Sequence, residues 1–186
     1  MQRIEVICGP MFSGKTEELL RRLKRLKYSK ANYMLFKPSL DNRYSEDEVL
    51  THDKTGLKSI PVNCAEEILD ICEQNPDIKI IAVDESQFFL RKEEHGRNLV
   101  EVVQELKDRG YRILLNGLDM DFLGKPFGLM PELLAIADDV VKLRSVCLVC
   151  GEDATMSYRV DPTKEVVQLG STEKYQARCF KHWHKN

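Results

Sequence analysis

The chain has 186 residues, a formal net charge of -2 and 42% hydrophobic residues. A chain of this length can bury one sizeable core, with room for a small additional module but not for a second full-sized domain. Ordinary glycine and proline contents exclude a collagen and a low-complexity polymer. Because no apolar run is long enough for a membrane span or a signal peptide, we expect a cytoplasmic protein without a membrane partner.

Strand-like and helix-like segments alternate through most of the chain. In chain order, the patterns predict a strand over 3–8, a helix over 16–27, a strand over 33–37, a long loop over 38–56, a strand over 57–62, a helix over 64–74 with Asn63 and Glu66 as a capping box, a strand over 78–83, a helix over 98–108, a strand over 112–118 and a short helix after Pro131. Such alternation is typical of an α/β fold, a mostly parallel sheet flanked by helices with ligands at the carboxyl ends of its strands.

A glycine-rich segment between the first predicted strand and helix matches the pattern G-x-x-x-x-G-K-[ST]. Its glycines allow a tight turn whose N–H groups converge on phosphate, and the following helix directs its positive end at the same anion. Lys15 is expected to reach the β- and γ-phosphates and Thr16 to bind Mg²⁺. The ATP-binding candidates are Gly9, Pro10, Met11, Phe12, Ser13, Gly14, Lys15 and Thr16. A P-loop NTPase-like sheet is the fold expected around them, and a chance match on a surface turn is the alternative.

Two carboxylates follow the apolar strand predicted to end at Val83. Asp84 is expected to hold Mg²⁺ through its hydration shell, and Glu85 can act as a general base. A cap or turn residue is the alternative for Asp84. The pair does not separate a kinase from an ATPase, because a glutamate in this place also polarises water in hydrolysing P-loop enzymes.

Two ligand pairs near the C-terminus have the spacing of a metal site. Cys147 and Cys150 form the first pair, and Cys179 and His182 form the second with the same spacing. Four such ligands suit a closed, tetrahedral, structural Zn²⁺ site. His184 could replace His182 as the fourth ligand, and free thiols with a terminal histidine are the alternative reading.

The alternation of strands and helices stops before the cysteine pairs. We therefore predict a nucleotide-binding α/β domain over 1–144 and a small zinc-binding domain over 145–186, organised by metal rather than by a core. Cys8, Cys64 and Cys72 have no partners at metal-binding spacing and are expected to be buried apolar residues.

A basic run follows the glycine-rich segment and raises the possibility of nucleic-acid binding. It comprises Arg21, Arg22, Lys24, Arg25, Lys27 and Lys30. The leucines between these residues share one helical face, so the charges are predicted to lie on the solvent side of an amphipathic helix. The slightly acidic net charge agrees, and we expect no nucleic-acid partner.

Taken together, the motifs resemble the type II, or cellular-type, thymidine kinase family from Ile4 to the end of the chain. The resemblance is carried by GPMFSGKTEELLRR at 9–22, DxRYS at 41–45 with THD at 51–53, DExQFF at 84–89, GLD at 117–119, KPFG at 125–128 and KY at 174–175. It implies transfer of the γ-phosphoryl group of ATP to the 5′-hydroxyl of thymidine in pyrimidine deoxynucleotide salvage, with Glu85 as general base and deoxyuridine as a second substrate. It also implies that Asp41, Arg43 and Gln87 lie near the nucleotide, with a solvated loop as the alternative for Asp41 and Arg43. It further implies that the enzyme is a homotetramer and that dTTP inhibits it.

In that family the loop between the zinc-ligand pairs, the lasso, closes over thymine as a lid. The resemblance implies that Tyr175 and the backbone of Val167, Gln168, Leu169 and Gly170 hold the pyrimidine. Met11, Leu118, Phe122, Phe127 and Ser157 match positions that enclose the ring and its 5-methyl group, with core packing as the alternative for Leu118 and the phenylalanines. Two other functions compete with this one, a P-loop ATPase that binds nucleic acid through its zinc module and a non-catalytic zinc-stabilised adaptor.

Overall fold

A computed structural model describes residues 2–39, 48–50, 56–89, 96–160 and 174–184. Its centre is a six-stranded sheet in the order β5-β2-β6-β7-β1-β8, and every pair in it is parallel. The strands are β1 (Arg3–Cys8), β2 (Met34–Pro38), β5 (Ile60–Val62), β6 (Ile80–Val83), β7 (Arg112–Gly117) and β8 (Asp139–Lys142). The predicted α/β class is confirmed, and the carboxyl ends of the three central strands β6, β7 and β1 meet at one edge.

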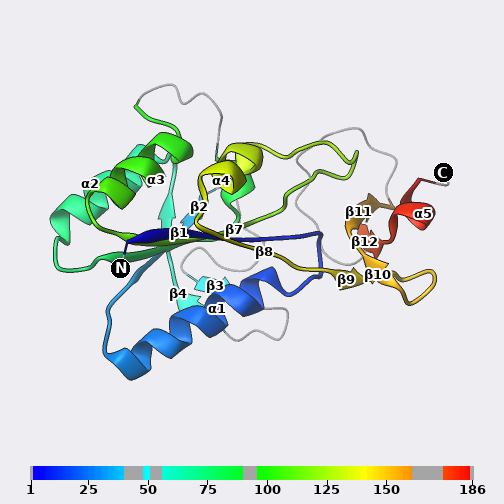
Figure 1. Ribbon diagram of the computed structural model, residues 1–186, viewed down its shortest axis with the longest axis horizontal. Coiled ribbons are helices and arrows are strands. Elements are labelled where there is room, and N and C mark those ends of the chain that lie inside the picture. Colours follow the sequence, from blue (N-terminus) through cyan, green and yellow to red (C-terminus); the bar gives the residue numbers. More distant parts are fainter. Residues whose placement is uncertain (1, 40–47, 51–55, 90–95, 161–173, 185–186) are drawn as a thin grey trace.

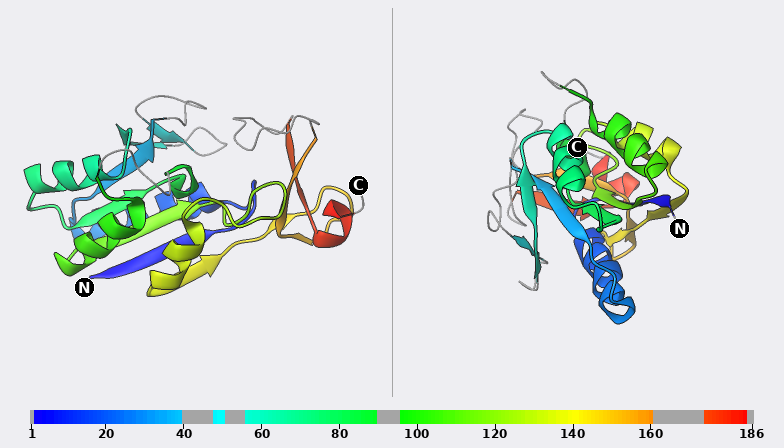
Figure 2. Two further views of the ribbon diagram at one scale, coloured as in Figure 1. Left: turned by 90° about the horizontal axis from the view of Figure 1, so that it is seen from above. Right: turned by 90° about the vertical axis from the view of Figure 1, so that its left-hand side faces the viewer.

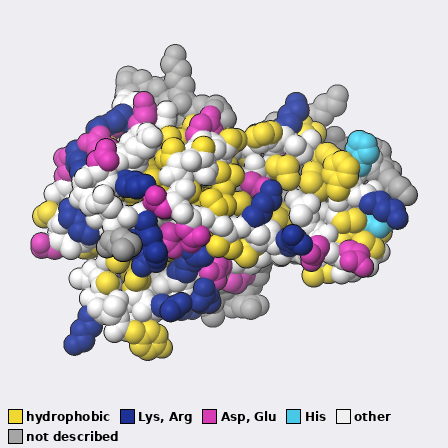
Figure 3. Space-filling view, in the orientation of Figure 1, with side chains coloured by type: hydrophobic (Ala, Val, Ile, Leu, Met, Phe, Trp, Pro, Cys, Tyr) yellow, Lys and Arg dark blue, Asp and Glu magenta, His cyan; other side chains and the backbone are white. Residues whose placement is uncertain are grey.

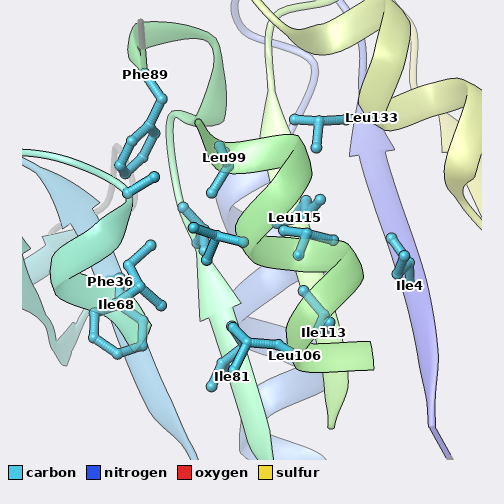
Figure 4. Packing of buried hydrophobic residues seen from close by; sticks show 14 of the residues in the cluster. Ile4, Phe36, Ile68, Ile81, Phe89, Leu99, Leu106, Ile113, Leu115 and Leu133 are labelled. Atoms are coloured by element: carbon cyan, nitrogen blue, oxygen red, sulfur yellow. The ribbon is translucent and has the colours of Figure 1, made fainter. Parts of the chain in front are cut away.

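Helices cover both faces of this sheet (Figure 1). The helix α1 (Lys15–Leu26) lies on one face, whereas α2 (Glu66–Gln74), α3 (Leu99–Asp108) and α4 (Met130–Ile136) lie on the other. Two separate apolar clusters result, because successive side chains of a strand point to opposite faces. Ile4 and Ile81 belong to the larger cluster under α2 and α3, which Figure 4 shows, and Ile7 and Ala82 pack with α1.

The segment after β8 forms two small antiparallel pairs and a short helix. In it β9 (Ser145–Val146) pairs with β10 (Asp153–Ala154), β11 (Met156–Arg159) pairs with β12 (Tyr175–Arg178), and α5 (Phe180–Trp183) follows. Figure 2 shows this segment at one end of an elongated molecule. Among the residues that the structure describes, its apolar cluster has Cys147, Ala154 and Ala177 as buried members, which is a small core.

Apolar side chains are exposed around this C-terminal segment. Figure 3 shows hydrophobic and histidine side chains together at the end that carries α5. Val146, Leu148, Val149 and Phe180 are all more than half exposed. None of the described helices is long and apolar enough to cross a membrane.

Two predicted elements between β2 and α2 differ from the structure. The predicted loop 38–56 contains a strand, β3 (Glu48–Leu50), which pairs with β4 (Gly56–Lys58), and the predicted strand 57–62 is divided between β4 and β5. Such a short hairpin strand lacks the alternating apolar pattern that identifies longer strands.

The predicted capping box of α2 is wrong. The helix begins at Glu66, and its N-terminal flanking residue, Ala65, makes no side-chain cap bond. Glu66 instead accepts from the Arg97 guanidinium at 2.7 Å and from the Arg97 backbone N–H at 2.8 Å. It is Glu67 that accepts the Asn63 backbone N–H. A guanidinium offers a carboxylate two donors, which a single backbone N–H does not.

The basic helix α1 is amphipathic as predicted, since all four leucines of its inner face are buried. Arg22 departs from the prediction, because it is largely covered and pairs with Glu5 on β1 at 2.7 Å and with Glu18 at 2.8 Å. Glu5 is only 2% exposed, and a buried carboxylate requires a cation beside it. Among the unpaired cysteines, Cys8 and Cys72 are buried as predicted but Cys64 is partly exposed.

Candidate active site

The glycine-rich segment forms a tight turn between β1 and the 12-residue helix α1. Positive φ values occur at Gly9, Phe12 and Gly14. A side chain at Gly9 could not fit, since its Cβ would lie 2.5 Å from the carbonyl oxygen of Leu143. The Lys15 ammonium donates to the Pro10 carbonyl at 2.7 Å, as does the Ser13 hydroxyl at 2.8 Å. The turn therefore brings a lysine and the N-terminus of α1 together, which is the arrangement that binds phosphate.

Two serines of the C-terminal segment bond to this turn. The Met11 N–H donates to Ser157 Oγ at 3.0 Å, and the Ser145 hydroxyl donates to the Phe12 carbonyl at 2.9 Å. Ser157 was predicted to lie beside the nucleoside, and the structure places its hydroxyl on the phosphate loop. Ser145 was missed, since nothing in its sequence surroundings indicates a partner more than one hundred residues away.

Asp84 follows β6 and lies beside Asn116 of β7. Val83 pairs with Leu115, so the next residue of each strand is also adjacent. Ala82 and Leu114, two positions earlier, pack with α1, which directs Asp84 and Asn116 toward the same face as the phosphate loop. Asp84 is 5% exposed, and its Oδ1 accepts from Asn116 Nδ2 at 2.5 Å and from the Glu85 N–H at 3.0 Å.

Asn116 was missed by the sequence analysis, although a polar residue within an apolar buried strand is a signal that could have found it. It is 1% exposed, and its Oδ1 has no hydrogen-bond partner among the residues that the structure describes. Asn116 therefore acts on the site through its amide nitrogen, which donates to Asp84 and fixes the plane of that carboxylate.

Glu85 has a left-handed backbone with φ of 52°, a conformation that is uncommon for non-glycine residues and that is found repeatedly at functional sites. Its Oε2 accepts from Gln87 Nε2 at 2.5 Å, while Gln87 Oε1 accepts the Leu118 N–H at 3.0 Å. Two glycines leave room for Gln87. A Cβ at Gly117 would lie 2.6 Å from Gln87 Oε1, and one at Gly128 would collide with the Gln87 carbonyl. Gln87 is thus held on several sides and orients the Glu85 carboxylate.

The described residues predicted to enclose a nucleoside lie on three parts of the fold: Met11 on the phosphate loop, Leu118, Phe122 and Phe127 after β7, and Ser157 and Tyr175 on the β11–β12 pair. Phe127 meets Phe88 edge to face, with ring centroids 5.9 Å apart, and the Phe122 ring lies under the Arg159 guanidinium. Leu118, Phe122, Phe127 and Met11 are each partly exposed, which disfavours simple core packing. The predicted residues Asp41, Arg43, Val167, Gln168, Leu169 and Gly170 lie outside the described residues.

The predicted metal ligands come together at the far end of the molecule. One ligand atom from each of Cys147, Cys150, Cys179 and His182 lies within 4.8 Å of all the others. The Cys150 and Cys179 sulfurs are 3.9 Å apart, and Cys147 Sγ is 3.7 Å from His182 Nδ1. A tetrahedral zinc with Zn–S bonds of about 2.3 Å separates its ligand atoms by roughly 3.8 Å, so these residues fit that ion.

Local contacts around the cluster agree with a metal site. The ring of His184 stacks on Phe180 with centroids 5.5 Å apart, whereas His182 turns its Nδ1 to the cysteines. Burial opposes ionisation of the Cys147 thiol, but backbone N–H donors outweigh burial and lower its pKa to about 6. The thiolate is the form of cysteine that binds zinc, and a lowered pKa favours the thiolate.

Comparison with known proteins identifies relatives over nearly the whole chain. The family model described as thymidine kinase matches residues 2–183. A thymidine kinase of Bdellovibrio bacteriovorus is 44% identical over 180 residues, covering 97% of this chain and 84% of the relative. A thymidine kinase of Bacteroides thetaiotaomicron is 44% identical over 177 residues, covering 95% and 84%.

A solved structure shares the fold at low sequence identity. The genome packaging NTPase B204 of Sulfolobus turreted icosahedral virus 2, in complex with ATP-gammaS, matches with a TM-score of 0.50 and 17% identity. The match covers 76% of this chain and 74% of that chain. The chain therefore has a P-loop NTPase-like fold.

Proposed function

This chain belongs to the thymidine kinase family, and on that premise we propose that it transfers the γ-phosphoryl group of ATP to the 5′-hydroxyl of thymidine and, as a second substrate, of deoxyuridine. One observation carries the proposal. The phosphate loop and the Asp84–Glu85 pair follow β1 and β6, whose carboxyl ends lie at one edge of the sheet with only β7 between them. Phosphoryl transfer depends mainly on positioning and charge neutralisation, and this edge supplies the groups for both.

The phosphate-binding role falls to the turn before α1. Its N–H groups and the Lys15 ammonium would cradle the β- and γ-phosphates. Mg²⁺, when bound, neutralises charge across these phosphates. The Thr16 hydroxyl and the Asp84 carboxylate fit that ion, because hard oxygen donors are its preferred ligands. Gln87, Asp41 and Arg43 complete the proposed nucleotide site.

Glu85 is the proposed general base. The 5′-oxygen attacks the γ-phosphorus, the bond to the β,γ-bridging oxygen breaks, and ADP departs. Glu85 accepts the hydroxyl proton late in this step. The bond from Gln87 to Glu85 Oε2 supports the assignment, because it orients the carboxylate without removing its charge.

We assign nucleoside binding to Met11, Leu118, Phe122, Phe127, Ser157 and Tyr175 with the backbone of Val167, Gln168, Leu169 and Gly170. In this proposal residues 1–144 form the nucleotide-binding domain, and residues 145–186 form a lasso domain held by structural Zn²⁺ at Cys147, Cys150, Cys179 and His182. The enzyme acts in the cytoplasm as a homotetramer inhibited by dTTP, and it has no nucleic-acid partner.

The test is turnover of the purified protein with ATP, Mg²⁺ and each of four nucleosides, thymidine, deoxyuridine, deoxycytidine and deoxyguanosine. We expect labelled monophosphate from the first two only, and a Glu85→Gln variant that binds ATP but is nearly inactive. No monophosphate, with ADP release stimulated by DNA or RNA, would instead identify a nucleic-acid-dependent ATPase.

A further inference from the structure

Arg159, the last residue of β11, carries a charge that the fold buries to 6% exposure. Burying a guanidinium is costly unless its donors are satisfied. Two of its nitrogens, Nε and Nη2, donate to the Tyr175 hydroxyl at 3.1 and 2.5 Å. Its central carbon lies 3.8 Å from the centroid of the Phe122 ring, a stacking distance. One side chain thus holds two aromatic residues of the proposed nucleoside site.

These two aromatic residues come from different parts of the fold. Tyr175 begins β12 and stands directly opposite Arg159 in the antiparallel register. Phe122 lies on the loop after β7, which belongs to the central sheet. The strand pair aligns Tyr175 with Arg159, and the stacked guanidinium extends that alignment to Phe122.

The Phe122 loop has a second attachment to the C-terminal segment. The Trp183 indole N–H donates to the Phe122 carbonyl at 3.0 Å. Gly124 packs so closely on the same indole that a Cβ there would lie 2.7 Å from the ring. Trp183 therefore holds the backbone of the loop, while Arg159 holds the side chain of Phe122.

We infer that Arg159 is a positioning residue for nucleoside binding, because it fixes the placement of Phe122 relative to Tyr175. This inference rests on the proposed function. Arg159 acts through the two aromatic residues rather than on the substrate itself. With their placement fixed before the nucleoside binds, the two aromatic residues are preorganised, which lowers the cost of binding.

The chemistry requires arginine at this position. Its planar guanidinium can stack on a ring through its face while donating from its edge, whereas the ammonium of lysine is a point charge that cannot do both. Arg159→Lys therefore keeps the charge and most of the length but loses the simultaneous contacts. Arg144→Lys is the matched control, because Arg144 lies in the same region, is 64% exposed and pairs with Asp153.

The experiment compares both variants with wild-type holoenzyme by steady-state kinetics, zinc content and melting temperature. For Arg159→Lys we expect a thymidine KM raised by about 10- to 100-fold, since small misplacements of binding groups have effects of this size. The ATP KM, the zinc content and the Arg144→Lys control should stay unchanged. A variant with wild-type thymidine KM overturns the inference. A parallel rise in both KM values, with loss of zinc, also overturns it and indicates a structural role.

A double-mutant cycle with Tyr175→Phe tests the route of the effect. Because Tyr175→Phe removes the hydroxyl that accepts from Arg159, the two substitutions should be non-additive in thymidine KM, whereas independent effects would multiply. If Arg159→Lys does not fold, Phe122→Leu tests the stacked contact with the same readout. Wild-type protein that does not phosphorylate thymidine would refute the proposed function. In that case the inference is tested by measuring thymidine binding through the fluorescence of the single tryptophan, Trp183. Equal thymidine affinities of wild type and Arg159→Lys would then overturn it.

Discussion

Asn116 donates its side-chain amide to the Asp84 carboxylate at 2.5 Å, and both residues are almost completely buried. The bond joins the ends of β7 and β6 at the edge of the sheet that carries the phosphate loop. It gives Asp84 one orientation, which matters because a carboxylate that binds a metal works best when a neighbouring group fixes its plane.

Asn116→Ala should weaken the response to Mg²⁺ more than the response to thymidine. We expect the free Mg²⁺ concentration at half-maximal rate to rise by about 10-fold, a usual effect of losing an outer partner of a metal-binding carboxylate. Equilibrium binding of a fluorescent ATP analogue, measured with and without Mg²⁺, should show that only the Mg²⁺-dependent part is lost. An exposed control, Asn75→Ala, should leave both measurements unchanged.

Glu85→Gln should abolish most turnover while leaving nucleotide binding intact. Removing a general base typically lowers the rate by about 10²- to 10⁴-fold. The amide also presents a different group to Gln87, so the kinetic comparison should include Gln87→Ala, which we expect to lower kcat less than Glu85→Gln does. Equal single-turnover rate constants for wild type and Glu85→Gln would exclude Glu85 as the base.

Loss of the proposed zinc should disable the proposed nucleoside site without changing any residue of the phosphate loop. Cys150→Ser, which replaces a proposed thiolate ligand, should lower zinc content and raise the thymidine KM, because β12 ends at Arg178, directly before the proposed ligand Cys179. Native mass spectrometry counts the zinc, and calorimetry with ATP serves as the internal control. Full activity in zinc-free protein would contradict the structural role.

Acid should destabilise the protein through the contacts of α1. Bonds from the Arg21 and Arg22 guanidinium groups outweigh burial and lower the pKa of Glu18 from its ordinary value of 4.5 to about 2. A depressed carboxyl pKa contributes stability above the unfolded value, and the contribution is lost as pH falls through the folded one. The loss should therefore occur between about pH 4.5 and 2.

Urea unfolding at several pH values tests this expectation. Glu18→Gln should lower the free energy of unfolding at pH 7 by about 1 kcal/mol or less, because solvent still reaches the side chain, and should flatten the acid limb. The exposed neighbour Glu17 provides the control, as Glu17→Gln. If the free energy of unfolding falls in the same way at low pH in wild type and Glu18→Gln, other carboxylates dominate the acid sensitivity. Glu5 is the first candidate, because bonds from Arg112 and Arg3 outweigh burial and lower its pKa.

Local signals in the sequence predicted most of the sheet and helices. The phosphate loop, the ligand spacing near Cys147 and the amphipathic face of α1 each depend on residues close together in the chain, so a linear pattern preserves them. Errors arose where a residue distant in the sequence replaced the hydrogen-bond partner that the local pattern predicted. Glu66 was predicted to cap its own helix, yet Arg97 offers it two donors from another loop.

The site was less accessible to sequence reasoning for the same physical reason. Gln87 was recognised within a motif, but its contact with Leu118 depends on the adjacency of β6 and β7. The sequence around Arg159 did not indicate a role for it. That role depends on the contact of Arg159 with the Phe122 ring, which forms only in the folded chain. The family could be predicted from the motifs. The partners that orient the site residues could be identified only in the folded structure.

The bonds from Ser145 and Ser157 to the phosphate loop have a consequence for protein engineering. A fragment that stops after β8 would keep every letter of the glycine-rich motif yet lose two of the bonds that shape it. Transplanting the C-terminal segment onto another P-loop scaffold should likewise fail unless both serines find their carbonyl and N–H partners. The recognisable motif is thus shorter than the smallest unit that can be exchanged between enzymes.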